Sequence, residues 1–259
     1  MALSANQIKR YRELHEAEGR RENGQFLVEG PTLIQEALKE GWPLEEVLMT
    51  SIATKGKEGQ KLLKLIELAG ISHGLCSPAE MARVADAVAP QGAVAVAKLP
   101  PPIDLSNALT AEVLLIGESI SDPGNLGALL RTADWFGVET VLLGAGSADP
   151  FSPKVVRASA GSIFRVKAVQ VADASQVISR EIGRGRRIYA ATLKGKMMPQ
   201  ELPPEGLRGL VIGHETRGVN SEIACLCTDT IKIPARGRAE SLNLAVAAGI
   251  LLYCLTNRG

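Results

Sequence analysis

The chain of 259 residues carries 29 Lys and Arg against 28 Asp and Glu, so its net charge of +1 gives no global field that would attract nucleic acid. Apolar residues make up 46% and aromatic residues only 3%, which favours helices packed on an aliphatic sheet over an aromatic-rich sandwich. The length suits two domains. No segment approaches the roughly 20 apolar residues of a membrane span, and no targeting segment is visible, so we expect a soluble, cytoplasmic protein.

Residues 1–97 predict a small α/β sandwich with its own core. A helix is expected over Ser4–Glu18, followed by a strand at QFLVEG. The segment PTLIQEALKEG predicts a second helix, since Pro31 suits a helix start and Gly41 follows its end. A second strand is expected at LEEVLMT, a third helix at GQKLLKLIELAG and a third strand at QGAVAVAKL.

Residues 98–110 form the expected linker, because three successive prolines disfavour the interior of helices and strands. In residues 111–259, strands are expected at EVLLIGES, TVLLGAG, RRIYAATL, LRGLVIGHE and DTIKIPA, with a loop at DPFSPKVVRASAGSIF and a closing apolar helix at SLNLAVAAGILLYCLTN. This alternation predicts an α/β domain whose mostly parallel sheet is covered on both faces. Ligands of such sheets bind beyond the carboxyl ends of the strands.

The first unusual loop follows the first of these strands, in SDPGNLGALLRTADWFGV. Asn125 is placed to cap the next helix. Gly127 and Arg131 are four residues apart and share a helix face, so the arginine lies beside a groove where it can grip a phosphate or carboxylate. An ion pair of Arg131 with Asp134 or Glu118 explains the same spacing without any ligand.

The second unusual loop is VIGHETRGVN, at the end of a later strand. Gly213 would let a ligand approach the backbone, and Glu215 places a carboxylate at the mouth of the crevice. A turn that only reverses the chain is the alternative, because one G-x-E-x-x-G pattern is weak by itself.

The third loop leads into the closing helix, in IKIPARGRAESLNLAVAAGI. Glu240, Ser241 and Asn243 cluster where that helix is expected to begin, and its free amides can accept an anion. Ser241 as a simple helix cap is the alternative reading. Asn243 is harder to explain by structure alone, since it occupies an early position of a strongly apolar helix.

Four unevenly spaced cysteines and three histidines do not complete a zinc pattern, so we expect reduced thiols and no metal site. Basic residues concentrate in two strips, 154–167 and 180–196. Phosphate binding and a solvated surface explain such strips about equally well.

Together the three loops resemble the three motifs of the SpoU (TrmH-like) family of RNA ribose 2′-O-methyltransferases, within the SPOUT superfamily. The matching residues are Asn125-x-Gly127-x-x-x-Arg131, Gly213-x-Glu215-x-x-Gly218, and Ile233-Pro234, Gly237 and Ser241-Leu242-Asn243. GQFLVEGPTLIQEAL resembles the start of the family's ribosomal-protein-like substrate-binding domain. Ala245 departs from the serine that many relatives have there.

The resemblance implies a SPOUT domain with a deep trefoil knot, S-adenosylmethionine as cofactor, and a homodimer with the active site at its interface. The implied reaction-side group is Arg131, Asn125, Glu215, Ser241 and Asn243. The implied cofactor contacts are Thr192, Leu193, Ile212, Gly213, Ile233 and Leu242. For RNA phosphates we expect contacts from Lys9, Arg10, Arg12, Lys154, Arg157 and Arg165.

The implied reaction is methyl transfer to a ribose 2′-hydroxyl of structured RNA, with 23S-type ribosomal RNA favoured over transfer RNA. A non-catalytic RNA-binding protein of the same fold is the alternative, and the intact motifs count against it. A guanidinium has a pKa above about 12 and is a poor base, so gripping a phosphate suits Arg131 better than proton removal. The sequence leaves open which group removes the proton, and whether Arg131 acts in its own or the partner subunit's site.

Overall fold

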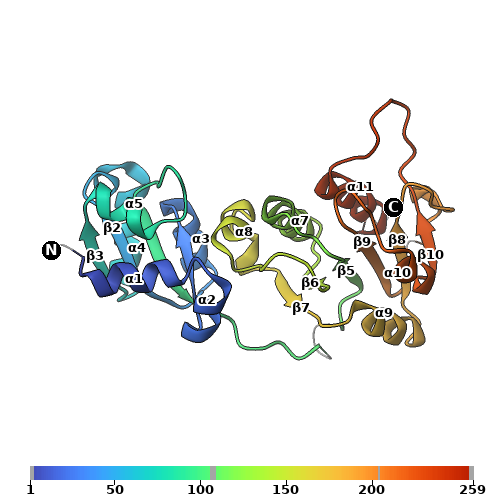
Figure 1. The fold of residues 1–259 in the computed structure, drawn as a ribbon, viewed down its shortest axis with the longest axis horizontal. Helices are drawn as coiled ribbons and strands as arrows, with labels where there is room; N and C mark the ends of the chain where they lie inside the picture. The colour runs from blue at the N-terminus through green and yellow to red at the C-terminus, as the bar shows by residue number, and fades with distance from the viewer. Residues whose placement is uncertain (1–2, 106–108, 204, 257–259) are drawn as a thin grey trace. The chain divides into compact units, whose positions relative to one another are not determined.

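The computed structural model describes residues 3–105, 109–203 and 205–256 (Figure 1). The chain forms two compact units. One is Met1–Pro101 with Asp149–Phe164, and the other is Pro102–Ala148 with Arg165–Gly259.

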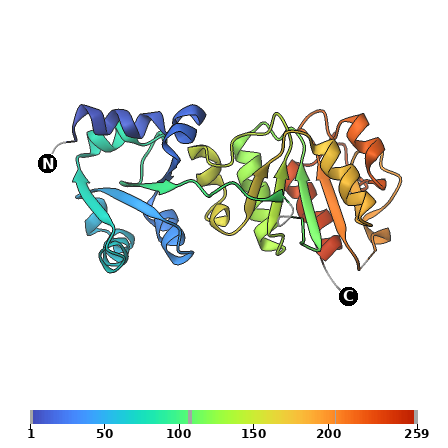
Figure 2. The same cartoon turned by 90° about the horizontal axis from the view of Figure 1, so that it is seen from below.

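The first unit contains a four-stranded sheet with helices on both faces (Figure 2). The strand order is β1 (Gln25–Glu29), β4 (Ala93–Lys98), β2 (Leu44–Thr50) and β3 (Ser72–Cys76), with β2 and β3 parallel and the other pairs antiparallel. Its helices are α1 (Ala5–Glu13), α2 (Ala17–Asn23), α3 (Pro31–Lys39), α4 (Lys57–Leu68) and α5 (Pro78–Val84), with a 3-10 turn at Ala53–Lys55. Helices α1 and α5 share one core with the sheet, and α3 packs with α4 on the opposite side.

The expected helix Ser4–Glu18 is wrong, because the chain breaks it into α1 and α2. Ser4 caps α1 and forms a capping box with Gln7. The buried guanidinium of Arg20 donates to the carbonyls of Leu14 and His15, at 2.9 and 2.7 Å. These bonds satisfy carbonyls that a continuous helix would have used internally.

Residues 149–164 belong to the first unit, although strands of the second unit flank them in sequence. The expected loop contains α8 (Pro153–Ala158) and a 3-10 turn at Ser162–Phe164. The ring of Phe151 lies 5.0 Å from that of Phe26, and Arg20 Nε donates to Asp149 at 2.9 Å. Aromatic packing and one buried charge therefore hold this segment on β1 and α2.

The second unit is a six-stranded, fully parallel sheet. Its order is β10 (Asp229–Ile231), β8 (Arg187–Ala191), β9 (Arg208–Ile212), β5 (Val113–Gly117), β6 (Thr140–Leu143) and β7 (Lys167–Gln170). Helices α9 (Ala174–Gly183) and α10 (Ser221–Leu226) share a core with one sheet face, while α7 (Pro123–Trp135) and α11 (Leu244–Thr256) pack together and contact β6 and β9. A further 3-10 turn spans Pro199–Glu201. The predicted α/β class with a parallel sheet is confirmed.

Several elements were missing from the sequence-based expectations: β3, α5, β7, α9 and α10. Strand β7 has one buried residue, so it shows no clear period. The expected strand DTIKIPA is shorter, because β10 ends at Ile231. Pro234, three residues later, has no amide with which to continue a ladder.

The basic strip 180–196 contains one arginine that cannot reach RNA. Arg186 is fully buried, and its guanidinium binds the Glu181 carboxylate at 3.1 Å. It also donates to the backbone carbonyls of Leu109, Ala111, Glu112 and Arg208 at 2.9–3.0 Å. Arg186 therefore ties the start of β8 to the segment before β5 and to the first residue of β9.

Candidate active site at the carboxyl ends of β5 and β9

The carboxyl ends of two neighbouring strands bring the first and second motifs together. Gly117 at the end of β5 pairs with Ile212 at the end of β9, and the Glu118 amide donates to the Ile212 carbonyl at 2.8 Å. The loops that follow these strands carry Asn125 and Glu215. The parallel sheet thus places these motifs at the edge where ligands of such folds bind.

A hydrogen-bonded chain joins one residue from each motif. Asn125 Nδ2 donates to Glu215 Oε1 at 3.2 Å, and Asn243 Nδ2 donates to Asn125 Oδ1 at 2.9 Å. The Asp122 amide and the Ser121 hydroxyl also donate to the Glu215 carboxylate, at 3.3 and 3.5 Å. These contacts link residues that are about 90 and 118 positions apart in the sequence.

Asn125 is not the helix cap that its position suggested. Asp122 caps α7, and its Oδ1 accepts the Asn125 amide at 2.8 Å. The side chain of Asn125, in the first turn, is therefore available for Glu215 and Asn243. Asp122 was missed in the sequence, although an aspartate before a proline at the first helical position is a recognisable start signal.

Arg131 lies on α7, and its exposed side chain makes no ion pair or hydrogen bond with any residue that the structure describes. The expected alternative partners are engaged elsewhere. Asp134 accepts from Arg165 Nη2 at 2.8 Å, and Glu118 Oε2 accepts from the Asn220 amide at 3.2 Å. The ion pairs that would explain Arg131 without a ligand are therefore absent from the described part of the chain.

Gly213 lies where another part of the backbone passes very close. A Cβ atom built at Gly213 would lie 2.2 Å from backbone atoms of Gly218 and Val219. The Gly218 amide donates to the His214 carbonyl at 2.8 Å, which closes a tight turn around Glu215. Gly218 has φ +70°, a left-handed conformation that favours glycine. Both glycines of the second motif are thus required by this turn.

The predicted cofactor residues lie at the end of β9 and on the loops after three adjacent strands, β8, β9 and β10. Ile212 is buried at the end of β9, and Ile233 is half-buried after β10. The Thr192 amide donates to the Ile231 carbonyl at 2.9 Å, so the loop after β8 runs along β10. Leu193 and Leu242 are exposed, with 74% and 47% of their surface accessible.

Gly195 is a further residue that the sequence reasoning did not single out. A Cβ there would lie 2.4 Å from the Ile231 carbonyl carbon. Glycine therefore lets the loop after β8 cross β10 closely. An isolated glycine after a strand was the available signal.

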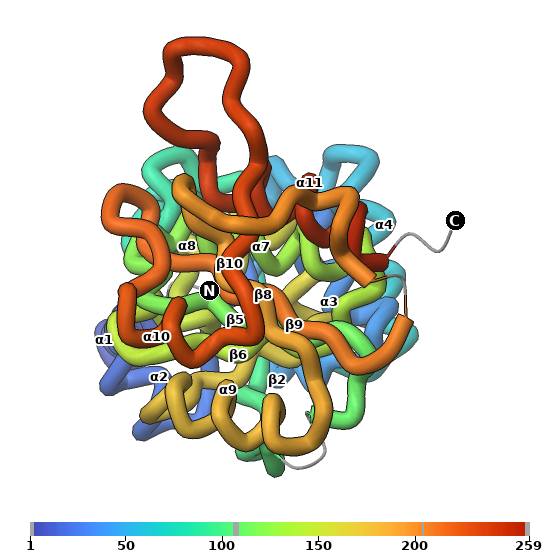
Figure 3. The backbone as a smooth tube through the Cα atoms, turned by 90° about the vertical axis from the view of Figure 1, so that its right-hand side faces the viewer, coloured from blue at the N-terminus to red at the C-terminus, as the bar shows by residue number. Residues whose placement is uncertain are grey.

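The loop between β10 and α11 projects from the sheet edge (Figure 3). It carries Ser241 and Leu242, and residues 234–243 are all exposed. Ser241 does not cap α11, contrary to the alternative raised from the sequence. Asn243 takes that place, because its Oδ1 accepts the amides of Ala245 and Val246 at 2.9 and 3.4 Å. Ser241 stays outside the Glu215–Asn125–Asn243 chain.

Most of the predicted RNA-contacting cations are held by carboxylates. The pairs are Lys9 with Glu13, Arg10 with Glu45 and Glu46, Arg157 with Glu29 and Asp86, and Arg165 with Asp134. Arg12 and Lys154 have exposed side chains. A phosphate would have to compete with these carboxylates for Lys9, Arg10, Arg157 and Arg165.

In the described ranges, no helix is both long enough and apolar enough to cross a membrane. Among the same residues, no group of three or more His, Cys, Asp or Glu side chains could hold a metal ion.

Comparisons with known proteins match both parts of the chain. The model of the SpoU rRNA Methylase family matches residues 112–253, and that of the MRM3-like substrate binding domain matches residues 5–95. The 23S rRNA (guanosine(2553)-2′-O)-methyltransferase RlmP of Bacillus subtilis is 32% identical, covering 96% of this chain and 95% of its own. The 23S rRNA (uridine(2479)-2′-O)-methyltransferase of Streptomyces viridochromogenes is 30% identical, covering 89% of this chain and 82% of its own.

A solved structure shares the whole architecture. The SpoU methyltransferase AviRb from Streptomyces viridochromogenes, crystallised in complex with the cofactor AdoMet, matches with a TM-score of 0.84 at 28% identity. The match covers 97% of this chain and 97% of AviRb.

Proposed function

Because this chain belongs to the SpoU rRNA methylase family, we propose that it transfers a methyl group from S-adenosylmethionine to a ribose 2′-hydroxyl of 23S-type ribosomal RNA. The observation that carries this proposal is the Glu215–Asn125–Asn243 chain, which joins all three motifs at one sheet edge. We assign RNA binding to residues 1–97 and methyl transfer to residues 111–259, joined by the linker 98–110.

The residues at this edge fit an adenosyl cofactor. Gly213 and Gly195 let backbone segments cross closely beyond the ends of β9 and β8. Leu193 and Leu242 expose apolar surface that a bound ligand would cover. With Thr192, Ile212 and Ile233, these residues would hold S-adenosylmethionine, which supplies an electrophilic methyl group.

Bound S-adenosylmethionine would supply its methyl group to the ribose 2′-oxygen, and the electron pair of the broken carbon–sulfur bond would stay on sulfur. Arg131 is exposed and unpaired among the described residues, so its planar fork is available for an RNA phosphate. A guanidinium held there stabilises negative charge as it develops on the 2′-oxygen. The hydroxyl proton passes to solvent or to a general base.

Glu215, Asn125 and Asn243 act together in this proposal. The Glu215 carboxylate accepts from two groups at the start of α7, the Asp122 amide and the Asn125 side chain. It therefore fixes the start of the helix that carries Arg131. Ser241, on the projecting loop, is assigned to the reaction side on its motif position.

We propose that the protein is a homodimer through its second unit. Trp135 on α7 and Val246 and Tyr253 on α11 expose 84%, 51% and 57% of their surface, and Ile250 lies between the latter two. Val246, Ile250 and Tyr253 follow helical spacing and share one face. Because such an apolar stripe is unfavourable in water, a second copy covering it explains its composition.

We further propose that the second unit is knotted and that the protein is cytoplasmic. Strand β8 lies between β9 and β10 in the sheet, so the segment that connects β9 to β10 must pass over β8. The chain then returns from the sheet edge to α11, which packs on β9 and α7. This crossing path is compatible with a trefoil knot.

The reaction is tested by incubating the protein with tritiated S-adenosylmethionine and, separately, total rRNA and total tRNA from cells lacking it. We expect label in 23S rRNA at a nucleotide that resists alkaline cleavage on its 3′ side, as 2′-O-methylation requires. Label confined to tRNA would assign the other RNA class. Binding of S-adenosylhomocysteine and of rRNA, without transfer to either pool, would favour a non-catalytic RNA-binding protein.

A further inference from the structure

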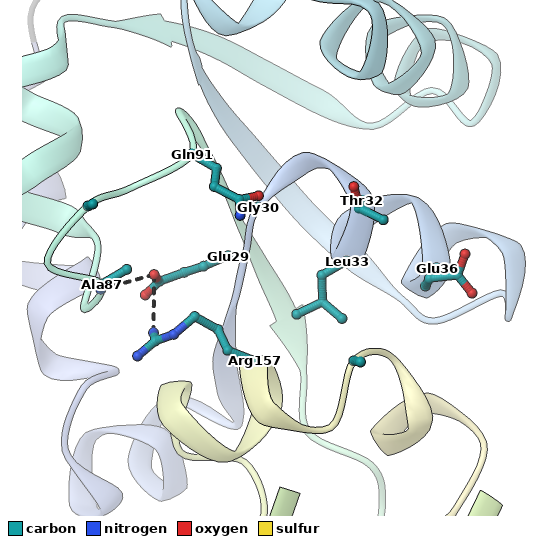
Figure 4. A pocket seen from close by; sticks show the side chains of 10 residues that line it. Glu29, Gly30, Thr32, Leu33, Glu36, Ala87, Gln91 and Arg157 are labelled. Carbon is teal, nitrogen blue, oxygen red and sulfur yellow. Dashed lines mark hydrogen bonds and ion pairs between the residues drawn. The ribbon is translucent and has the colours of Figure 1, made fainter. Parts of the chain in front are cut away.

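A cavity of about 390 Å³ lies within the first unit (Figure 4). It is bordered by the end of β1, the start of α3, the loop before β4 and α8, and its lining includes Gly30, Thr32, Leu33, Ala89, Gln91 and Arg157. Pockets for small ligands have volumes of roughly 300–1,000 Å³, so this cavity suits a small group.

One wall of the cavity is fixed by buried charge. The Glu29 carboxylate accepts the amides of Asp86 and Ala87 at 2.7 and 3.1 Å and pairs with Arg157 at 3.2 Å (Figure 4). Arg157 also donates to Asp86 at 2.7 Å. Glu29 is buried, so the loop before β4, the end of β1 and α8 are held together by a single carboxylate. Such a wall needs no rearrangement to receive a ligand.

Other groups at the cavity have hydrogen-bonding capacity to spare. Helix α3 begins at Pro31, and its first bond is from the Ile34 amide to the Gly30 carbonyl at 3.1 Å. The Thr32 and Leu33 amides therefore have no intrahelical acceptor. The Gln91 side chain approaches Gly30 so closely that a Cβ there would lie 2.8 Å from Gln91 Oε1. Donors and acceptors thus lie beside the apolar Leu33 and Ala89.

The charges around the cavity argue against a phosphate. Three carboxylates, those of Glu29, Asp86 and Glu36, lie at or beside it, against the two cations Arg157 and Lys39. Both cations are already bound by these carboxylates. A neutral ligand would not be repelled by these carboxylates. If it had donors and acceptors along one edge and apolar faces, it could contact both the polar and the apolar residues of the lining. An unstacked nucleobase of single-stranded RNA has this chemistry.

We propose that this cavity binds one unstacked nucleobase of the RNA substrate. The proposal rests on the proposed function and adds to it a specific base contact, distant in sequence from the methyl-transfer motifs. Arg157 then serves as a wall of the base pocket, with its charge held by Glu29 and Asp86.

The test fills the cavity from its rim. Ala89 is exposed in the loop before β4, so Ala89→Phe places a ring at the cavity while leaving the core intact. We expect the Kd for 23S rRNA, measured by filter binding with RNA from cells lacking the protein, to rise by about tenfold or more. The dependence of log Kd on log salt should keep its slope, because no phosphate contact is lost.

Ala82→Phe, on the exposed side of α5, is the matched control and should leave the Kd unchanged. Gln91→Ala, which removes a polar group without adding bulk, should weaken binding in the same direction. An unchanged Kd in both Ala89→Phe and Gln91→Ala overturns the base pocket while the proposed function stands. A reduced salt slope would overturn it in favour of a phosphate site. Wild-type protein that neither binds nor methylates rRNA contradicts the proposed function itself.

Discussion

At the scale of single residues, Asn125 links the other two motifs. Its side-chain amide donates to Glu215 through Nδ2 and accepts from Asn243 through Oδ1, so both polar atoms of Asn125 are used. This is possible because Asp122 takes over the capping of α7. The side chains could be chosen from the sequence because polar residues after buried strands are conspicuous. Their partners could not, because contacts over 90 or more positions depend on strand order.

We expect Asn125→Ala to lower kcat/KM by about tenfold, the loss expected for a hydrogen bond of roughly 1.5 kcal/mol. Asn243→Ala should have a similar effect on kcat/KM. The fold-loss of kcat/KM in the double variant should be smaller than the product of the two single fold-losses, because the residues share one hydrogen bond.

Asn243→Ala also removes the α11 cap, which should lower the free energy of unfolding by about 1 kcal/mol. Asn243→Ser, which keeps a capping oxygen, separates the two effects: restored stability with low activity supports the link. Fully multiplicative losses would show that the two asparagines act independently.

Burial raises the pKa of the Cys227 thiol to about 12 from an ordinary value of 9.0. The unfolded chain therefore releases this proton at lower pH than the folded protein does. The contribution to stability is complete below pH 9 and is lost as pH rises toward about 12. The free energy of unfolding, measured with urea at about pH 8 and pH 10, should fall between these two pH values by less in Cys227→Ala than in the wild type. Cys225→Ala, at an exposed thiol, is the control; equal losses in all three proteins would rule out this role of Cys227.

At the scale of elements, the most apolar segments were predictable, and several less apolar ones were not. Strand β9 and helix α11 are mostly or fully apolar along their length, whereas β7 and α10 have only one buried residue each. The start of α11 was placed three residues too early, because Ser241 and Asn243 are both good caps. Only the hydrogen bonds of Asn243 decide between them.

Gly213→Ala tests the turn after β9. Because its Cβ would lie 2.2 Å from backbone atoms, something must shift, and we expect a loss of about 2 kcal/mol of stability with weakened S-adenosylhomocysteine binding. Gly237→Ala, in the projecting loop, meets nothing within 4 Å and should leave stability unchanged. Denaturant unfolding and calorimetric titration measure both quantities. If Gly213→Ala had the stability and the S-adenosylhomocysteine affinity of the wild type, the turn would accommodate a Cβ atom without destabilising the protein.

At the scale of the whole molecule, the two-part organisation followed from the proline-rich linker, but the place of residues 149–164 did not. Their sequence lies inside the methylase family match, yet they pack on β1 and α2 of the first unit. Local pattern cannot reveal this, because the Arg20–Asp149 bond spans 129 positions. A knotted path was likewise an expectation from resemblance alone, because periodicity carries no information about chain crossing.

The proposed dimer predicts that Val246→Glu yields monomers in sedimentation velocity, because a charge in the apolar stripe of α11 opposes burial. Val88→Glu is the matched control, since Val88 is fully exposed in the first unit. It should leave the sedimentation coefficient unchanged. A Val246→Glu protein that sediments like the wild type would place the dimer contact elsewhere.

The measurement that tests the central claim most directly is the rate of tritiated methyl transfer to 23S rRNA by Arg131→Ala. Its side chain is exposed and unpaired among the described residues, so its loss should leave folding and S-adenosylhomocysteine binding intact. We predict a fall in kcat of at least about a hundredfold. Arg131→Lys, which lacks the planar fork, should recover little of it, and Arg83→Ala, at an exposed arginine of α5, should behave as the wild type. Normal transfer by Arg131→Ala would contradict the assignment of the active site.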